Sequence, residues 1–227
     1  MKAPRLLAAS VFLLASIGAS ATVTYTLGGG TGPYLALSGT TGSTCTGTAG
    51  ADPCSLDGTF ASISGGKIFT TGDPSFAALP AGTFGGNFLS AGPTPSNDEP
   101  ATMTFASPIS DIGFLWGSPD TYNLLTVETT MGNVSFTTGS LGFTVQDGDQ
   151  SFSQYVWFHA KDGAAITALV FDNNPATNAF EVANFSVSAV PEAQTYALML
   201  FGLGALAMFA RRRRGAAARG IGGGLAL

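Results

Sequence analysis

Alternating apolar and polar positions between residues 101 and 189 predict a series of short β-strands. Apolar side chains recur at every second position, as half-buried strands require. The segment 154–159, Gln-Tyr-Val-Trp-Phe-His, is apolar on both faces and predicts a central strand. The alternating positions are Met103 and Phe105; Ile112, Phe114 and Trp116; Leu125 and Val127; Val134 and Phe136; Ile166, Ala168 and Val170; and Phe180, Val182, Phe185 and Val187.

The residues before position 101 have a different composition. Residues 22–66 are rich in Gly, Thr and Ser, and the alternation of Val23, Tyr25 and Leu27 predicts a first strand. Residues 72–100 contain five prolines, which argue against central strands, so we expect a long proline-rich loop there. Short strands, Gly/Asp/Asn turns and no helical periodicity predict an all-β domain over residues 22–189, an antiparallel, jelly-roll-like β-sandwich.

The two ends of the chain carry apolar segments of another kind. Lys2 and Arg5 precede an apolar run that ends in small residues at position 21, the order of parts of a secretory signal peptide. We therefore expect signal peptidase to remove residues 1–21. Residues 193–210 contain no charge, and a helix of that length spans about 27 Å, enough to cross a bilayer core. We expect this transmembrane helix to be followed by a cytoplasmic tail at 215–227.

The carboxy-terminal segment resembles a known sorting signal. A short motif precedes the apolar helix and an arginine cluster follows it: Val190, Pro191 and Glu192, then Arg211, Arg212, Arg213 and Arg214. In this order of parts, residues 190–214 resemble the PEP-CTERM signal of exosortase substrates, with Pro-Glu-Ala in place of the usual Pro-Glu-Pro. The resemblance implies anchoring in the inner membrane after export. It also implies cleavage by an exosortase-type membrane protease and delivery to the cell surface or outside the cell.

Charge is distributed unevenly along the chain. Between residues 22 and 191 there are two basic residues, Lys67 and Lys161, and thirteen acidic ones, which gives this part a net charge of −11. A domain with so few cations cannot neutralise many phosphates, and this excludes nucleic acid as a partner. The same charge repels acidic polysaccharide unless a divalent cation bridges the two.

Cys45 and Cys54 are the only cysteines of the chain. Export to an oxidising compartment predicts a disulfide between them. Closing so short a loop stabilises a fold by about 2.7 kcal/mol in the chain-entropy description.

A second resemblance concerns the predicted strands. Residues 113–123, Gly-Phe-Leu-Trp-Gly-Ser-Pro-Asp-Thr-Tyr-Asn, resemble the Phe-x-Trp-Gly-Ser-x-Asp-x-Tyr-Asn core of a group of exosortase-dependent surface proteins. Two further stretches of that pattern follow at 155–158 and 179–184. The resemblance spans about residues 101–190 and implies a secreted β-sandwich surface domain, without implying a reaction.

The residues expected of a hydrolase are sparse. The chain has one histidine, His159, and no Gly-x-Ser-x-Gly motif, so we expect His159 to be structural and predict no enzymatic activity. Thirteen acidic residues leave a glycosidase-like carboxylate pair as the least favoured alternative.

Two kinds of ligand site are candidates. Calcium takes oxygen ligands that gather in loops, and the leading candidates for a structural calcium are Asp147, Asp149 and Asp172. Ordinary turn acids are the competing interpretation. Further oxygen ligands are offered by Asp120, Asn123, Asn173 and Glu181. Sugar rings could stack on Trp116, Trp157 or Tyr122, for which packing in the core is the competing interpretation.

These features together predict an exported cell-surface or extracellular-matrix protein with a structural or adhesive role. A calcium-dependent carbohydrate-binding module is the main alternative. The expected partners are signal peptidase, an exosortase-type protease, the membrane and extracellular polysaccharide.

Overall fold

The computed structural model describes residues 22–30, 32–47, 54–73, 76–93, 98–188 and Leu203. The chain divides into two units, Met1–Ser188 and Ala189–Leu227. In the described ranges no helix has the length and hydropathy needed to cross a membrane. Several predictions fall outside the described residues: the signal peptide 1–21, Val190, Pro191 and Glu192, the helix 193–210, Arg211–Arg214 and the tail 215–227.

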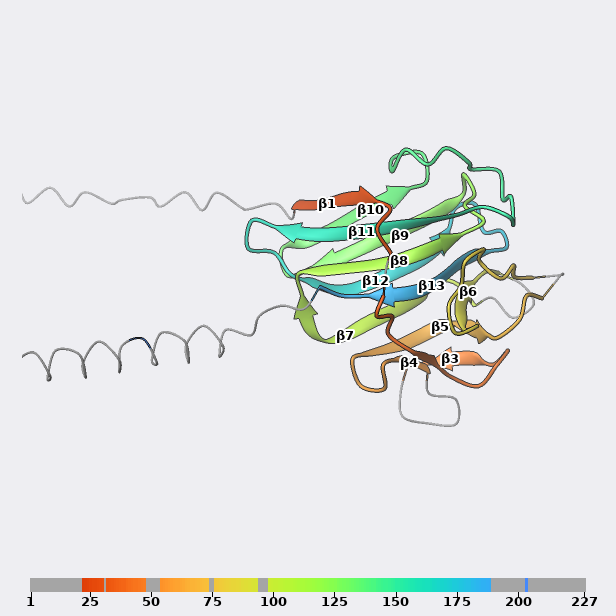
Figure 1. Ribbon diagram of the computed structural model, residues 1–227, viewed down its shortest axis with the longest axis horizontal. Helices are drawn as coiled ribbons and strands as arrows, with labels where there is room; N and C mark the ends of the chain where they lie inside the picture. The colour runs from red at the N-terminus through yellow and green to blue at the C-terminus, as the bar shows by residue number, and fades with distance from the viewer. Residues whose placement is uncertain are drawn as a thin grey trace, which may run out of the picture. The chain divides into compact units, whose positions relative to one another are not determined.

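The described part of the first unit is a single antiparallel sheet (Figure 1). Its strands run in the spatial order β1-β11-β8-β13-β6-β5-β7-β12-β9-β10, with β2, β3 and β4 attached beside β5. The strands are β1 (Thr22–Leu27), β2 (Leu37–Ser38), β3 (Thr44–Thr46), β4 (Cys54–Leu56), β5 (Ala61–Phe69), β6 (Phe88–Ala91), β7 (Ala101–Ile109), β8 (Asp111–Gly117), β9 (Asn123–Thr129), β10 (Gly132–Thr137), β11 (Ser153–Lys161), β12 (Ile166–Asn173) and β13 (Phe180–Ser186).

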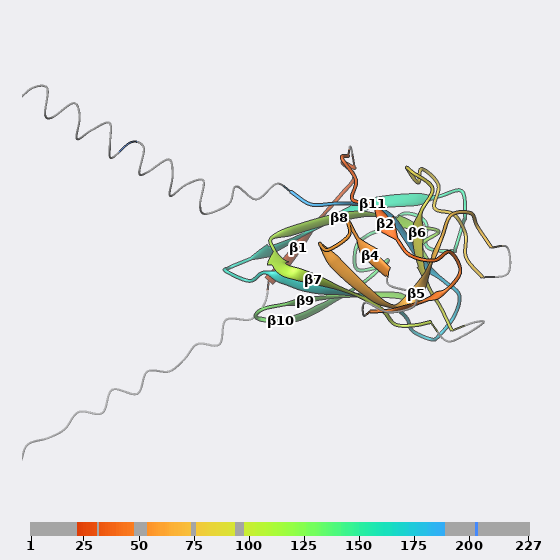
Figure 2. The ribbon, with the colours of Figure 1, turned by 90° about the horizontal axis from the view of Figure 1, so that it is seen from below.

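The sheet curls until its first and last strands, β1 and β10, approach each other. Tyr25 of β1 packs edge-on against Phe136 of β10 at 6.0 Å between ring centroids, and its hydroxyl donates to the Ser140 carbonyl at 3.1 Å. Figure 2 shows β8 and β11 on one side of the interior and β9 and β10 on the other. The prediction of an all-β antiparallel fold is confirmed. In place of two separate sheets there is one near-barrel, because strand twist accumulates over a long sheet and folds it onto its own apolar face.

Aromatic side chains fill the space inside this curl. Phe114 of β8 lies between 5.5 and 5.7 Å, centroid to centroid, from the rings of Phe158, Phe171 and Phe185. Trp116, two residues further along β8, is fully buried and stacks on Phe180 at 4.2 Å. Trp116 is therefore a core residue, and its candidacy for stacking on a sugar is wrong.

The expectation of a loop throughout 72–100 is also wrong in part. Phe88–Ala91 forms strand β6, which lies inside the sheet between β13 and β5. The prolines of this segment all lie outside those four residues, so none removes a hydrogen bond from the ladder. The residues before β6 contribute to a second apolar cluster, made of Phe69, Phe76, Ala77, Phe88 and Ala183. The loop thus covers the outer face of the sheet beside β13, and this position creates the site described next.

Candidate functional site: a polar pocket beside strand β13

A pocket of about 330 Å³ opens where four segments converge. These are the residues after β5, the β8–β9 turn, the loop before β11 and the start of β13. Four acidic residues line it: Asp73, Asp120, Asp147 and Glu181. Tyr122, Gln150 and Asn178 add a hydroxyl and two amides. The lining suits ligands that offer hydrogen-bond donors or positive charge, and it disfavours anions.

Glu181 is the buried member of this pocket, with 3% of its surface exposed. Its neighbours on β13, Phe180 and Val182, belong to the main core, so Glu181 lies on the opposite, outer face beneath the loop. It accepts hydrogen bonds from Ser118 Oγ at 2.8 Å and from the Ala78 backbone N–H at 3.0 Å. Burial outweighs these two bonds and raises the pKa of Glu181 to about 8. Glu181 is therefore mainly protonated, and neutral, at pH 7.

Asp120 and Tyr122 form the polar edge of the pocket. Burial raises the pKa of Asp120, and the charge of Asp147 adds to this effect, against a hydrogen bond from Tyr122. The Tyr122 hydroxyl lies 2.6 Å from both Asp120 Oδ2 and the Asn178 carbonyl oxygen, either of which can accept its proton. Gly148 has φ +74°, and a Cβ there would lie 2.8 Å from Asp120 Oδ1. Glycine at 148 therefore lets the two sides of the pocket approach each other.

Asn123, a further candidate for calcium, is instead a buried link between strands. Its amide nitrogen donates to Asn173 Oδ1 at 2.8 Å and to the Ala179 carbonyl at 3.4 Å. Its amide oxygen accepts from the Asp120 backbone N–H at 2.8 Å and from Trp116 Nε1 at 3.2 Å. These four bonds use both donors and both acceptor positions of the side chain. Asn123 therefore has no capacity left for an ion and serves to hold the turn that carries Asp120.

The three leading calcium candidates do not converge on this pocket. Asp147 lines it, whereas Asp149 and Asp172 do not. The Asp149 carboxylate accepts from both the hydroxyl and the backbone N–H of Ser151, and these bonds lower its pKa. Asp172 accepts from the backbone N–H of Asn173. Across the described ranges, no group of three or more His, Cys, Asp or Glu side chains is placed to hold a metal ion. Calcium binding by these residues stays a prediction.

The two cysteines lie in β3 and β4, two small strands attached beside β5. Cys45 and Cys54 are joined by a disulfide, with their Cα atoms 5.2 Å apart, and both are buried. The bond joins two of the small strands that are attached beside β5.

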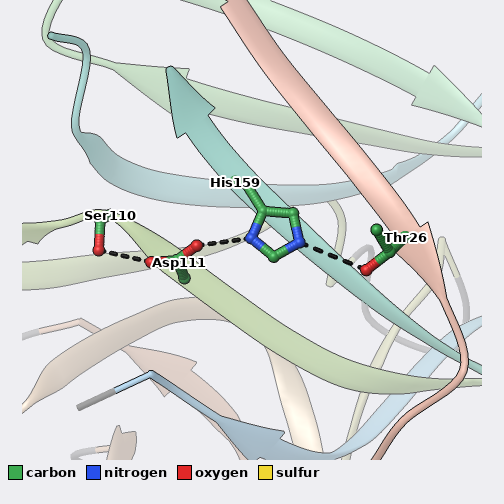
Figure 3. A network of polar contacts seen from close by, with 4 residues as sticks. All are labelled: Thr26, Ser110, Asp111 and His159. Atoms are coloured by element: carbon green, nitrogen blue, oxygen red, sulfur yellow. Dashed lines mark hydrogen bonds and ion pairs between the residues drawn. The ribbon is translucent and has the colours of Figure 1, made fainter. Parts of the chain in front are cut away.

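A second polar cluster lies on the outer face of β1, β8 and β11 (Figure 3). His159 Nδ1 lies 2.5 Å from Asp111 Oδ1, and its Nε2 lies 3.3 Å from Thr26 Oγ1. Ser110 Oγ donates to Asp111 Oδ2 at 2.6 Å. Burial opposes ionisation of Asp111, but the bonds from Ser110 and His159 and the nearby positive charges outweigh it, so its pKa lies below the ordinary value. His159 thus links β1 to β8 across β11.

The remaining aromatic candidates occupy different places. Tyr122 is partly buried at the edge of the pocket, where its hydroxyl is hydrogen bonded. Trp157 is partly exposed on the outer face, beside His159.

Comparison with known proteins bears on the carboxy-terminal segment. Residues 189–214 match the PEP-CTERM protein-sorting motif. This motif implies membrane-anchored sorting, processing by exosortase and export to the cell surface. No curated protein and no solved structure matches the chain. The resemblance of residues 101–190 to a group of surface proteins therefore stays a prediction.

Sequence reasoning missed Asp73 and the burial of Glu181. Asp73 lies in the segment expected to be an irregular loop, and no motif surrounds it. Glu181 was seen only as a calcium candidate, because alternation along β13 places it opposite the core and says nothing of what covers that face. A glutamate enclosed by Ala179, Phe180, Val182 and Ala183 is the one local signal that could have indicated burial.

Proposed function

We propose that the chain is a structural or adhesive component of the cell surface or extracellular matrix, with the β domain as its exposed part. The observation that carries the proposal is the match of residues 189–214 to the PEP-CTERM motif, directly after a compact unit that ends at Ser188. A sorting signal at that position delivers the preceding domain as cargo. The proposal includes no enzymatic activity, and it is supported by the single histidine of the chain serving as a link between strands.

The test compares three chains in cells that lack the native one: the wild type, a chain with Arg211–Arg214 changed to Ser, and a chain lacking residues 22–188. Cell fractionation and intact-mass measurement report location and cleavage, and surface attachment reports the role. We expect the wild type at the surface, cut near Pro191, and restored attachment. The arginine variant should lose retention or orientation in the membrane. The chain without its domain should be sorted but inactive.

Two results would contradict different parts of the proposal. Full-length protein ending at Leu227 as the sole surface form would exclude cleavage and leave a simple anchor. Equal attachment by cells with and without residues 22–188 would exclude the structural or adhesive role.

A second candidate function is carbohydrate binding, with or without calcium. It is favoured by the partly exposed Trp157 and by the polar pocket, because aromatic faces and fixed polar groups are the two means by which proteins hold sugars. Binding of the purified chain to polysaccharides, measured with calcium and with chelator, tests this candidate separately from sorting.

A further inference from the structure

We propose that the outer face around Trp157 binds a neutral polysaccharide, with a sugar ring stacked on the indole and its hydroxyls bonded to Thr26 and Asp111, which His159 holds in place. The inference rests on the carbohydrate-binding function named above, to which it assigns a site and a class of ligand.

Trp157 lies flat against the sheet. It faces outward from β11, since Val156 and Phe158 on either side of it belong to the core. Its partners across the two neighbouring strands are Thr26 of β1 and Gly113 of β8. A Cβ at Gly113 would lie 2.6, 2.7 and 2.9 Å from three atoms of the indole. Nearly equal distances to three ring atoms mean that the ring covers Gly113 with its face, so its other face is directed away from the sheet.

His159 extends this surface along the same strand. Its ring is nearly parallel to the indole, at 11° between planes and 6.4 Å between centroids. Alternate residues of a strand share a face, so Trp157 and His159 form one aromatic platform. The C–H groups on one face of a pyranose ring pack well on such a platform because both surfaces are flat and apolar.

Polar side chains that can meet sugar hydroxyls lie around His159, namely Thr26, Ser110 and Asp111 (Figure 3). The His159 and Asp111 side chains are 24% and 23% exposed, so both are accessible yet held in place. The bonds to Ser110 and Thr26 fix their orientation before any ligand arrives. Groups that are already ordered lose little entropy on binding, which favours affinity from few contacts. Separate hydroxyls of one sugar can donate to the Asp111 carboxylate and to Thr26 Oγ1, because both have acceptor positions left.

Charge and shape define the class of ligand. The net charge of −11 between residues 22 and 191 repels acidic polymers, and this favours an uncharged saccharide. Enclosed pockets are typical of sites for small molecules, whereas Trp157 lies on the surface of three paired strands. An open face of this kind can accommodate a chain that continues beyond the bound unit. The geometry therefore favours a polysaccharide over a free monosaccharide.

The experiment measures binding of the purified full-length chain in detergent to hydroxyethylcellulose, a neutral probe, and to polygalacturonate, an acidic one. We expect saturable binding to the neutral probe and little to the acidic one. Trp157→Ala should weaken binding roughly tenfold, the scale of one lost stacking contact. Phe84→Ala is the matched control, since Phe84 is also aromatic and 74% exposed but belongs to a separate loop. It should bind as the wild type does.

A second measurement needs no variant. Trp116 is fully buried, so acrylamide should quench mainly the fluorescence of Trp157, and bound hydroxyethylcellulose should protect it. Equal affinity of Trp157→Ala and wild type, without protection, would overturn the site but leave carbohydrate binding elsewhere on the domain. Absence of binding to both probes would overturn the site and the carbohydrate-binding function together. Surface delivery, measured by fractionation, is independent of either result.

Discussion

Replacing Glu181 by Gln should remove most of the dependence of stability on pH above pH 5. The carboxyl group is buried beneath the loop that follows β5, where it accepts from Ser118 and Ala78. A glutamine of the same shape can keep both contacts: its oxygen can accept from Ala78, and its amide can donate to the Ser118 hydroxyl. The change therefore removes the titration while preserving the packing.

The direction follows from the raised pKa. Glu181 has a pKa of about 8 in the folded chain against an ordinary value of 4.5. Between these values the folded state holds a proton that the unfolded state has lost, so the free energy of unfolding falls as the pH rises. Stability from this group is complete below about pH 4.5 and is lost by about pH 8. Each tenfold difference in proton affinity is worth about 1.4 kcal/mol, so the loss is on the order of 5 kcal/mol.

Urea titrations of the purified chain at pH 5, 7 and 9 measure this loss. The wild type should lose stability progressively over the series, whereas Glu181→Gln should change much less. The two proteins should be similar at pH 5, and the variant should be the more stable at pH 9. A residual slope of the same sign is expected in the variant, because burial raises the pKa of Asp120 and Glu99 as well.

Glu128→Gln is the matched control, since Glu128 is a partly exposed glutamate in β9 outside the pocket. It should retain the slope of the wild type. Parallel curves for the wild type and Glu181→Gln would refute the reasoning, because they would mean that water reaches Glu181 in the folded state.

Three further changes test other parts of the fold. Asp98→Asn removes the carboxylate that lies 3.1 Å from the buried Lys67 ammonium, and it should lower the free energy of unfolding by roughly 3 kcal/mol in urea. Adding Lys67→Met to Asp98→Asn removes the unpaired ammonium and should restore much of the lost free energy of unfolding. If the double variant is no more stable than Asp98→Asn, the unpaired charge is not the cause of the loss. Reduction of the Cys45–Cys54 disulfide should cost about 2–3 kcal/mol, measured by melts with and without reductant; coincident melts would contradict this. Millimolar calcium should raise the melting temperature of the wild type more than that of Asp147→Asn. Identical melts with calcium and chelator would exclude that site.

The strands after residue 100 could be predicted because their neighbours in the sheet supply an ordinary half-buried environment. In β9, Leu125 and Val127 are buried and alternate with partly exposed residues. The alternation of apolar and polar residues in the sequence therefore predicts this strand. β6 could not be predicted, because all four of its residues are buried and show no alternation. Its pairing with β13 and β5 depends on residues far away in the chain, and proline-rich flanks conceal it.

The pocket could not be predicted from the sequence either, because it also depends on residues that are far apart in the chain. It is assembled from segments around Asp73, Asp120, Asp147 and Glu181, which are separated by up to about a hundred residues. Closure of the sheet depends on a contact between β1 and β10 that no local pattern encodes. Composition and alternation specify which residues are apolar, but they do not specify which loop covers which outer face.

The stretch 113–123 has a structural explanation for its polar and glycine positions. A Cβ at Gly117 would lie 2.6 Å from Pro80, so only glycine lets the covering loop approach. Ser118 holds Glu181, and Asn123 holds the turn that carries Asp120. The pattern therefore describes the way in which a loop is fastened onto the sheet.

Trp157 is more exposed than its neighbours on β11. Val156 and Phe158 fill the core, and Tyr155 is buried with its hydroxyl bonded to the Asn184 carbonyl at 3.2 Å. Each of these three is required by packing or hydrogen bonding. Trp157 is partly exposed on the outer face, where its indole covers Gly113 and packs beside Tyr155 and His159. The face of the indole directed away from Gly113 is the part that the proposed sugar contact would use.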